Sequence, residues 1–258
     1  MNYIGIDIGS TCAKTVVLNE KKEIIQEFVQ PTGWSSVDTA EEIHQKLELS
    51  GINLSDDSSC CVATGYGRIS VPYADKTVTE ITCHALGAVQ LFQQPNLTVI
   101  DIGGQDTKII QIEQGFVKDF IMNDKCAAGT GRFLEVMANT LSLRPNEMFD
   151  LARLGSDTTI SSMCTVFAES EVIGLIGKGE PKENIAYAVV NSTIRKVAAQ
   201  VSRMNGEIST FCLTGGLCEC DYIREALSKE LGNEVISCPD ARYAGAIGAA
   251  LSAMKIQR

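Results

Sequence analysis

One eight-residue pattern occurs twice in this chain and constrains its fold more than any other feature. Residues 7–14 read Asp-Ile-Gly-Ser-Thr-Cys-Ala-Lys, and residues 101–108 read Asp-Ile-Gly-Gly-Gln-Asp-Thr-Lys. In both copies an apolar strand leads into the Asp, a second strand follows the Lys, and a third comes after a polar turn. The six strands are expected at residues 3–6, 15–18, 24–29, 97–100, 109–112 and 116–121. The chain therefore contains the same β-β-β unit twice.

Helical periodicity follows each unit. Helices are expected at residues 37–49, 79–92, 131–141, 146–154, 168–176, 183–204, 220–231 and 244–254, and late strands at 210–214 and 234–236. Ser36 or Asp38 is placed to cap the first helix. Three strands followed by alternating helices and strands, twice over, predict an α/β protein with two similar lobes. We expect one lobe at 1–94 together with the C-terminal helix 244–258, and the other at 95–243.

The repeated hairpin suits phosphate binding. Gly9 and Gly103 each follow a strand-terminal Asp by two residues, and a glycine there lets backbone N–H groups approach a phosphate. Asp7 and Asp101 are placed to hold Mg²⁺ through its waters. Ser10 and Thr11 add hydroxyl donors, and Lys14 and Lys108 could reach phosphate oxygens.

The alternative is that each Asp-Ile-Gly marks an ordinary turn. Two copies at matched spacing favour phosphate binding, and the sequence contains neither Gly-x-x-x-x-Gly-Lys-[Ser/Thr] nor a Gly-x-Gly-x-x-Gly after a strand. A further strand ends in Leu213-Thr214-Gly215-Gly216, whose bare backbone could lie against an adenosine. That segment alone would also suit a plain strand-to-helix turn.

Charge and hydropathy exclude other classes of function. The formal net charge of −10 and the isoelectric point near 4.8 argue against a nucleic-acid partner. No apolar run approaches the ~20 residues that cross a membrane. The first residues lack the basic and apolar regions of a signal peptide, so we expect a cytoplasmic protein.

The ten cysteines are then free thiols or metal ligands. Cys60, Cys61 and Cys212 lie in predicted strands, where cysteine is usually a small buried apolar residue. Cys218 and Cys220 could form a metal-binding or redox-active pair, although such motifs usually separate their cysteines by two residues. Of the two histidines, we expect His44 on an exposed helix face and His84 in the core as a satisfied histidine rather than a ligand.

With both hairpins, Thr214-Gly215-Gly216 and the final Gly-Ala-Ile-Gly-Ala-Ala at 245–250, the chain resembles the actin, Hsp70 and hexokinase superfold throughout its length. The resemblance implies an actin-like ATPase (ribonuclease H-like) fold, with a mixed sheet flanked by helices in each lobe. Segments 122–134, 164–171 and 101–106 are more specific. They resemble the activator, or component A, of 2-hydroxyacyl-CoA dehydratases, a family related to the ATPase subunits of benzoyl-CoA reductase.

This resemblance implies a homodimer that holds one [4Fe-4S] cluster, with Cys126 and Cys164 of each chain as ligands. It implies ATP-driven transfer of a low-potential electron to a dehydratase or a related double-cubane iron-sulfur enzyme, with a ferredoxin or flavodoxin as donor. A four-iron cluster takes four thiolates, which two cysteines per chain supply only across a two-fold axis. The alternative is that both are buried structural thiols.

The implied site gives Mg-ATP many contacts. Gln105, with Asp7 and Asp101, is our candidate catalytic group, because it could orient the attacking water. Arg242 stands where related activators carry Gln. The expected nucleotide-binding residues are Gly9, Ser10, Thr11, Cys12, Ala13, Lys14, Gly103, Gly104, Gln105, Asp106, Gly215, Gly216 and Arg242.

Two other classes of function compete with this interpretation. The same superfold includes N-acetylglucosamine kinases, in which case Asn123 and Asp124 would form a sugar-binding pair with Asp124 as general base. A nucleotide-switched regulatory module would need no chemistry beyond hydrolysis. A kinase has no use for Cys126 and Cys164.

Overall fold

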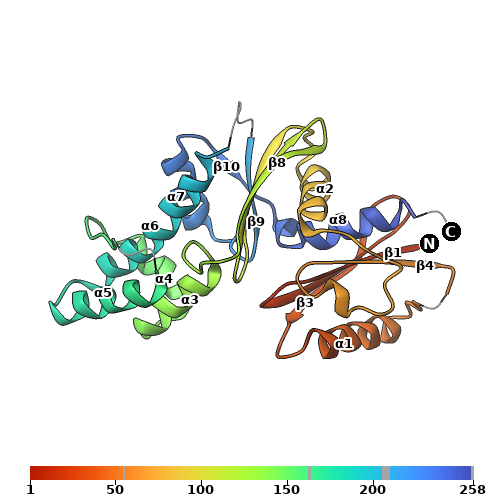
Figure 1. Cartoon of the computed structure of the whole chain (residues 1–258), viewed down its shortest axis with the longest axis horizontal. Helices are drawn as coiled ribbons and strands as arrows, with labels where there is room; N and C mark the ends of the chain where they lie inside the picture. Colours follow the sequence, from red (N-terminus) through yellow and green to blue (C-terminus); the bar gives the residue numbers. More distant parts are fainter. Residues whose placement is uncertain (55, 162–163, 205–209, 257–258) are drawn as a thin grey trace. The chain divides into compact units, whose positions relative to one another are not determined.

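The structure, a computed structural model, describes residues 1–54, 56–161, 164–204 and 210–256 (Figure 1). The chain divides into two compact units. Unit 1 holds Met1–Val99, Ile110–Lys118 and Cys238–Arg258, and unit 2 holds Ile100–Ile109 and Asp119–Ser237. Each unit is described by itself below.

The sheet of unit 1 is mixed. Its five strands run in the order β3-β2-β1-β4-β5. Their bounds are β1 Asn2–Ile8, β2 Cys12–Leu18, β3 Ile24–Pro31, β4 Ser59–Thr64 and β5 Lys76–Thr77. β1 is antiparallel to β2 and parallel to β4, and the register places Asp7 beside Lys14 on one side and Thr64 on the other.

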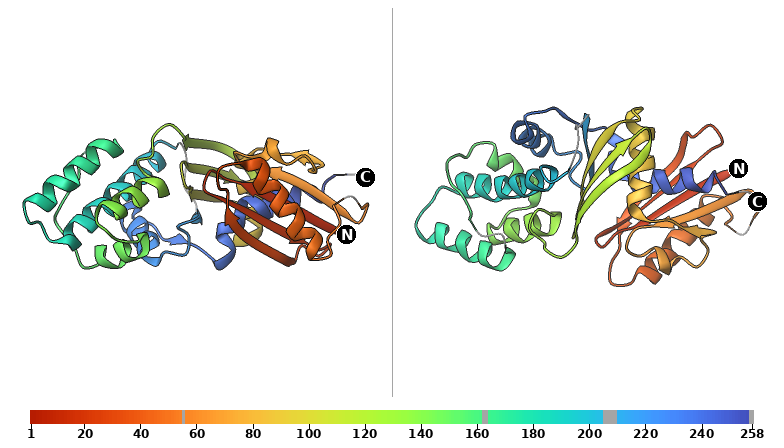
Figure 2. Two further views of the ribbon diagram at one scale, coloured as in Figure 1. Left: turned by 90° about the horizontal axis from the view of Figure 1, so that it is seen from below. Right: turned by 45° about the horizontal axis from the view of Figure 1, so that its top comes forward.

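Helices cover both faces of this sheet (Figures 1 and 2). On one face Ile4, Ile6 and Ile8 of β1 pack against Ile43 and Leu47 of α1 (Ser36–Leu49). On the other face, residues of β2 pack against α8 (Ala244–Ala253), which also lies against α2 (Glu80–Phe92). The short 3₁₀ helices η1 (Arg68–Ser70) and η2 (Pro239–Tyr243) complete unit 1.

The start of α1 differs from the prediction by one residue. Its N-cap is Ser35, whose extended backbone lets its hydroxyl accept a hydrogen bond from the Asp38 N–H at 3.2 Å. Ser36 is already helical, and Asp38 supplies the capped N–H and an acidic side chain to the first turn. The predicted caps were therefore wrong, because Ser35 and Ser36 are equivalent in the sequence until the backbone conformation is known.

The second sheet has the order β10-β9-β6-β7-β8. Its strands are β6 Leu97–Ile102, β7 Thr107–Glu113, β8 Phe116–Asn123, β9 Thr210–Gly215 and β10 Val235–Ile236. The succession β6-β7-β8 repeats β1-β2-β3, which confirms the predicted duplicate unit.

Five helices lie in the described part of unit 2. They are α3 Gly131–Thr140, α4 Pro145–Ala152, α5 Thr165–Gly177, α6 Lys182–Val201 and α7 Asp221–Leu231. The long helix α6 packs against each of the other four, and Figure 2 shows α3 to α6 as one helical group. Buried Ile185, Val189 and Val197 of α6 form much of its core.

Glycines set the spacing of α8 in unit 1. A Cβ on Gly5 of β1 would lie 1.9 Å from the Ala246 carbonyl oxygen, and one on Gly248 of α8 would lie 1.8 Å from that of Cys83 in α2. Real Cβ atoms never come so close to backbone oxygen. The helix therefore packs on its neighbours through backbone contact.

We predict that Gly248→Ala destabilises the protein by about 1–3 kcal/mol or more, because two backbones would have to separate. Gly174→Ala is the matched control, since Gly174 lies inside α5 with nothing within 4 Å of its Cβ position. It should stabilise by about 0.5–1 kcal/mol through helix propensity. Urea unfolding followed by circular dichroism measures both changes, and a parental midpoint for Gly248→Ala would contradict the packing described here.

Candidate functional site

Residues outside the first hairpin, which lies between β1 and β2, form hydrogen bonds to its backbone. The Thr32 hydroxyl donates to the Gly9 carbonyl at 2.7 Å, the Thr32 N–H donates to that of Thr11 at 2.9 Å, and the Gly67 N–H donates to that of Ile8 at 2.9 Å. Within the described part of the chain, the N–H groups of Ser10 and Thr11 donate no backbone hydrogen bond. Two consecutive, exposed donors are thus available to an anion.

The second hairpin, between β6 and β7, has the same property. The Gly103 N–H closes the turn by donating to the Asp106 carbonyl at 2.9 Å. Over residues 1–54, 56–161, 164–204 and 210–256, no backbone acceptor takes a hydrogen bond from the N–H of Gly104 or Gln105. Gln105 is exposed and stands at the tip of the loop. Both hairpins therefore present adjacent backbone donors of the kind that bind phosphate.

Asp101, at the end of β6, is buried among polar partners of unit 2. Its Oδ1 accepts a hydrogen bond from the Thr214 hydroxyl at 2.8 Å, and its Oδ2 lies 3.4 Å from Lys108 Nζ. Gly215 has a φ of +83°, and a Cβ there would lie 2.5 Å from the Ile102 carbonyl oxygen. The predicted Thr214-Gly215 segment is thus in direct contact with the predicted metal-binding carboxylate.

Asp7 of unit 1 has different neighbours. It is 5% exposed, and His84 Nε2 of α2 lies 4.0 Å from its Oδ2. His84 is a core residue, as predicted, and the fold places the Asp7 carboxylate beside it. Gly65, after β4, and Gly245, at the start of α8, complete the surroundings of the carboxylate.

The two lysines of the repeated pattern are not equivalent in the structure. Lys108 is buried and forms ion pairs with Asp101 at 3.4 Å and Asp106 at 2.7 Å. Lys14 forms no ion pair with any described residue. The position that matches Asp106 is Cys12, which has no carboxylate. The ammonium of Lys14 is therefore available to a phosphate, whereas that of Lys108 is already paired.

The remaining predicted nucleotide contacts lie in both units. Gly216 of unit 2 has open space at its Cβ position. Ala13 is buried in β2. Arg242 of unit 1 lies on η2, where its charge acts to lower the pKa of Glu27, although burial raises that pKa by more.

The loop that carries Cys126 is tied directly to the second hairpin. The N–H groups of Gly131 and Arg132, which begin α3, donate to the carbonyls of Gly103 and Gly104 at 2.9 and 2.8 Å. The Thr107 hydroxyl of β7 donates to the Gly129 carbonyl at 2.6 Å. Three hydrogen bonds thus join this hairpin and β7 to the residues that follow Cys126.

Asn123 braces the same loop from the end of β8. Its side-chain N–H₂ donates to the carbonyls of Cys126 at 2.8 Å and Ala128 at 3.2 Å. The Thr130 hydroxyl closes the turn by donating to the Ala127 carbonyl at 2.6 Å. Sequence reasoning missed this role of Asn123, although an amide three residues before a Cys-Ala-Ala-Gly turn is a signal for such bracing.

Cys164 is exposed and is the N-cap residue of α5. The Glu171 carboxylate of α5 accepts hydrogen bonds from the N–H and hydroxyl of Ser161, at 3.1–3.3 Å, and so holds the loop before Cys164. Thr140 of α3 donates to Glu169 of α5 at 3.1 Å. The two helices that follow Cys126 and Cys164 are therefore joined.

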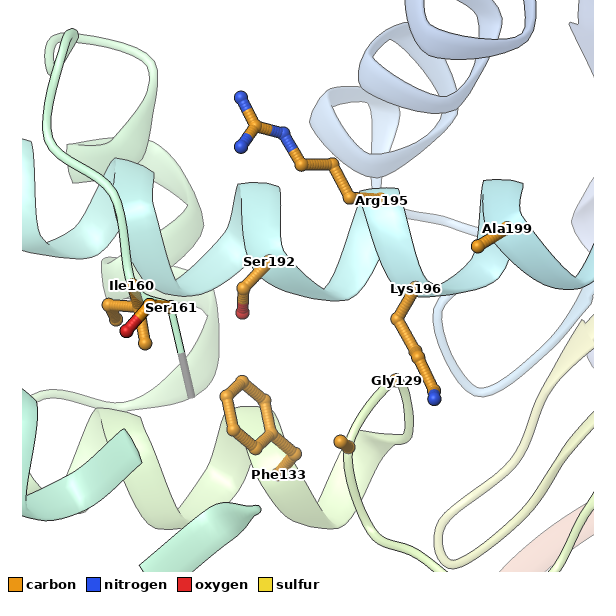
Figure 3. Close-up of a pocket in the computed structure, with 9 residues that line it drawn as sticks. Gly129, Phe133, Ile160, Ser161, Ser192, Arg195, Lys196 and Ala199 are labelled. Atoms are coloured by element: carbon orange, nitrogen blue, oxygen red, sulfur yellow. The ribbon is translucent and has the colours of Figure 1, made fainter. Parts of the chain in front are cut away.

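Both cysteine-bearing loops line one cavity of about 170 Å³ in unit 2 (Figure 3). Ala128 and Gly129 come from the first loop, and Ile160 and Ser161 come from the second. Phe133 of α3 and Lys196 of α6 border the same space, with Lys196 beside Gly129 (Figure 3). The fold thus brings together the segments before α3 and before α5.

The other cysteines are mostly buried. Cys60, Cys61 and Cys212 are buried in β4 and β9, which confirms the structural interpretation. Burial raises the pKa of the Cys83 thiol to about 12, and it also raises the pKa of Cys220 at the start of α7. Such thiols stay protonated and neutral, which disfavours them as metal ligands. Among the described residues no group of three or more His, Cys, Asp and Glu could hold a metal ion.

Within the part of the chain that the structure describes, no helix is both long and apolar enough to span a bilayer.

Comparison with known proteins places these features in one family. The sequence profile of the BadF/BadG/BcrA/BcrD ATPase family matches residues 4–253. The chain is 45% identical over 258 residues to the (R)-2-hydroxyglutaryl-CoA dehydratase activating ATPase of Acidaminococcus fermentans, covering 98% of this chain and 96% of the relative. It is 42% identical to the activator of lactoyl-CoA dehydratase of Anaerotignum propionicum, with 98% and 97% covered.

Solved structures agree. The activator of the 2-hydroxyisocaproyl-CoA dehydratase from Clostridium difficile with bound ADPNP superposes with a TM-score of 0.88 at 33% identity, covering 100% of this chain and 99% of the other. A ROK family glucokinase from Streptomyces griseus has a TM-score of 0.62 at 16% identity, with 99% and 100% covered, which shows the shared actin-like fold alone. The predicted superfold and family resemblance are both confirmed.

We predict that Lys108→Met destabilises the protein by about 3–5 kcal/mol, because it leaves the buried Asp101 carboxylate without its cation. The equivalent change in the first hairpin, Lys14→Met, should stay within about 0.5 kcal/mol of the parent, since no described residue pairs with Lys14. Urea unfolding without nucleotide measures both variants. Equal effects of the two substitutions would show that the hairpins are electrostatically equivalent.

Proposed function

This chain belongs to the BadF/BadG/BcrA/BcrD ATPase family, and from that premise we propose that it is an ATP-dependent donor of low-potential electrons. It activates a 2-hydroxyacyl-CoA dehydratase, or a related double-cubane iron-sulfur enzyme, by single-electron transfer driven by ATP hydrolysis. The observation that carries this proposal is the pair of hydrogen bonds that joins a phosphate hairpin to the start of α3, directly after the Cys126 loop.

Nucleotide binding follows from the two hairpins. The backbone donors at Ser10, Thr11, Gly104 and Gln105 take the phosphates, and Lys14 adds a cation. Asp7 and Asp101 hold Mg²⁺ through its waters. Gln105, exposed at the tip of its loop, orients the attacking water. The adenosine lies against Gly215 and Gly216, where the bare backbone permits close approach.

The thiols of Cys126 and Cys164 fit the donor set of a [4Fe-4S] cluster. Neither residue is fully buried, and their loops line one cavity. Because the described part of one chain holds no complete metal-binding group, the four thiolates would come from two chains of a homodimer. When bound, such a cluster accepts and releases one electron at low potential.

The chain itself links the nucleotide to these thiols. A γ-phosphate that closes on Gly104 and Gln105 shifts the carbonyls that accept hydrogen bonds from Gly131 and Arg132. The Thr107 hydroxyl passes the same displacement to Gly129. Such a displacement acts as a switch if one structural element has two arrangements and ATP binds one of them better than the other. The arrangement of α3 relative to its own loop is our candidate for that element.

The relatives support a dehydratase as the partner, since their names specify activation of dehydratases. A ferredoxin or flavodoxin supplies the electron in the cytoplasm. The kinase alternative is weaker, because the Asn123 amide already donates twice to the Cys126 loop and Asp124 pairs with Lys125 at 3.2 Å. A sugar-binding pair would need both side chains.

We predict that Asp7→Asn and Asp101→Asn each abolish ATP hydrolysis in a folded protein, because each removes one carboxylate charge from the metal site. Gln105→Ala should lower kcat by about tenfold or more while leaving nucleotide affinity within about threefold, since it acts on the attacking water. Phosphate release and ADP titration measure the two quantities. Parental hydrolysis in either Asp variant would refute the role of that hairpin.

We predict that Cys126→Ser or Cys164→Ser, purified without oxygen, lacks the visible absorbance of the parent and loses most of its dimer, yet still binds nucleotide. Cys238→Ser is the control, since Cys238 is a half-buried thiol of unit 1 that should leave iron unchanged. Iron analysis should give about four irons per two chains in the parent and control. A full iron content in either ligand variant would exclude that cysteine.

A further inference from the structure

His84 and Asp7 form a buried polar pair in unit 1. Asp7 is the last residue but one of β1 and is 5% exposed, and His84 lies in the first half of α2 and is 4% exposed. Nε2 of the imidazole lies 4.0 Å from Oδ2 of the carboxylate, at the outer limit of an ion pair. Contacts of this kind commonly tighten when the reacting ligand binds.

Two glycines leave room for this pair. A Cβ on Gly65, whose φ is +83°, would lie 2.4 Å from Asp7 Oδ1. A Cβ on Gly245 of α8 would lie 2.5 Å from Asp7 Oδ2 and 3.0 Å from His84 Nε2. Only glycine at these two positions admits both the carboxylate and the imidazole.

Backbone contacts fix where His84 stands. The neighbouring residue Cys83 has its carbonyl against Gly248 of α8, and Gly87, one turn along α2, lies against the Ala244 carbonyl. Because these contacts leave no space for sliding, α2 holds one register against α8. The imidazole therefore keeps a fixed position beside Asp7.

The two aspartates of the repeated pattern are stabilised differently. Asp101 has the Lys108 ammonium and the Thr214 hydroxyl. Among the described residues, no lysine or arginine forms an ion pair with Asp7, and the imidazole of His84 lies 4.0 Å from its carboxylate. A buried carboxylate needs a polar partner to keep one orientation, and in unit 1 the partner is an imidazole.

We propose that His84 is a positioning residue for ATP hydrolysis, which fixes the orientation of the Asp7 carboxylate toward the metal-nucleotide complex. The inference rests on the proposed role of Asp7 and extends it to a residue that touches neither nucleotide nor metal. Groups that orient a metal-binding carboxylate typically contribute about 10- to 100-fold to metal affinity or activity.

The test compares His84→Leu, which removes the polar contact, with His84→Gln, which keeps an N–H donor. His84→Leu should lower kcat for ATP hydrolysis by about 10- to 100-fold and raise the Mg²⁺ concentration needed for half-maximal activity. The affinity of His84→Leu for ADP, measured in EDTA, should stay within about twofold of the parent affinity. The same titration measures the fraction of the variant protein that is folded and able to bind ADP. His84→Gln should restore most of kcat. His44→Gln is the control, since His44 lies on α1 beside exposed Glu48.

Two results would overturn the inference. The first is a folded His84→Leu protein with parental kcat and parental Mg²⁺ dependence. The second is an equal loss in His84→Gln and His84→Leu, which would indicate packing alone. If His84→Leu fails to fold, His84→Gln and His84→Asn replace it. Their side-chain N–H donors reach to different distances, so a positioning role predicts different kcat values for the two variants.

A double-mutant cycle separates this inference from the role of Asp7. In an Asp7→Asn background, His84→Leu should no longer change the Mg²⁺ dependence of ADP binding, because the carboxylate that His84 orients is gone. Activity retained in Asp7→Asn itself would refute the metal-binding role of Asp7. Loss in Asp7→Asn without any effect of His84 substitutions would refute only the positioning role.

Discussion

Two hydrogen bonds hold the functional part of unit 2 together, from Gly131 and Arg132 to the carbonyls of Gly103 and Gly104. They use the first free N–H groups of α3, which any helix start must satisfy, and they satisfy them with a phosphate hairpin. The hairpin is anchored in turn by Asp101, which Lys108 and Thr214 hold in the core. The segment between hairpin and helix, including Cys126, is therefore tied at its far end to the hairpin that we propose binds phosphate.

The same fold sets Cys126 and Cys164 apart from the other cysteines in their surroundings. Cys126 and Cys164 each precede a helix, and their loops are braced by Asn123 and Glu171 from neighbouring elements. Burial keeps other thiols, such as Cys83, protonated. A braced backbone before a helix thus distinguishes the two proposed ligands, of which Cys164 is exposed and Cys126 is half-buried. The bracing contacts are short in sequence, since Asn123 donates to a carbonyl three residues later and Glu171 accepts from Ser161, ten residues earlier.

The sequence predicted the strands and helices well because hydrophobic period and glycine turns are local signals. The β-β-β repeat, the order of later elements and the Thr214-Gly215 turn are examples. It could not distinguish Lys14 from Lys108. The two lysines differ because the Asp106 carboxylate reaches the Lys108 ammonium, whereas Cys12, at the matching position, has no carboxylate. It also missed the pairing of His84 with Asp7, which depends on how α2 packs on α8 and β1. The contact between His84 and Asp7 is a tertiary one with no local pattern in the sequence.

The account requires that the nucleotide state of the hairpins changes the surroundings of the cluster thiols. The most direct measurement is the rate at which a ferrous chelator removes iron from the anaerobically purified protein with ATP, with ADP and without nucleotide. We expect a faster rate with ATP, because a shift of the hairpin opens the Cys126 loop and the subunits to solvent. Equal rates in all three states, with a normal iron content, would contradict the coupling and leave an ATPase whose cluster does not respond to nucleotide.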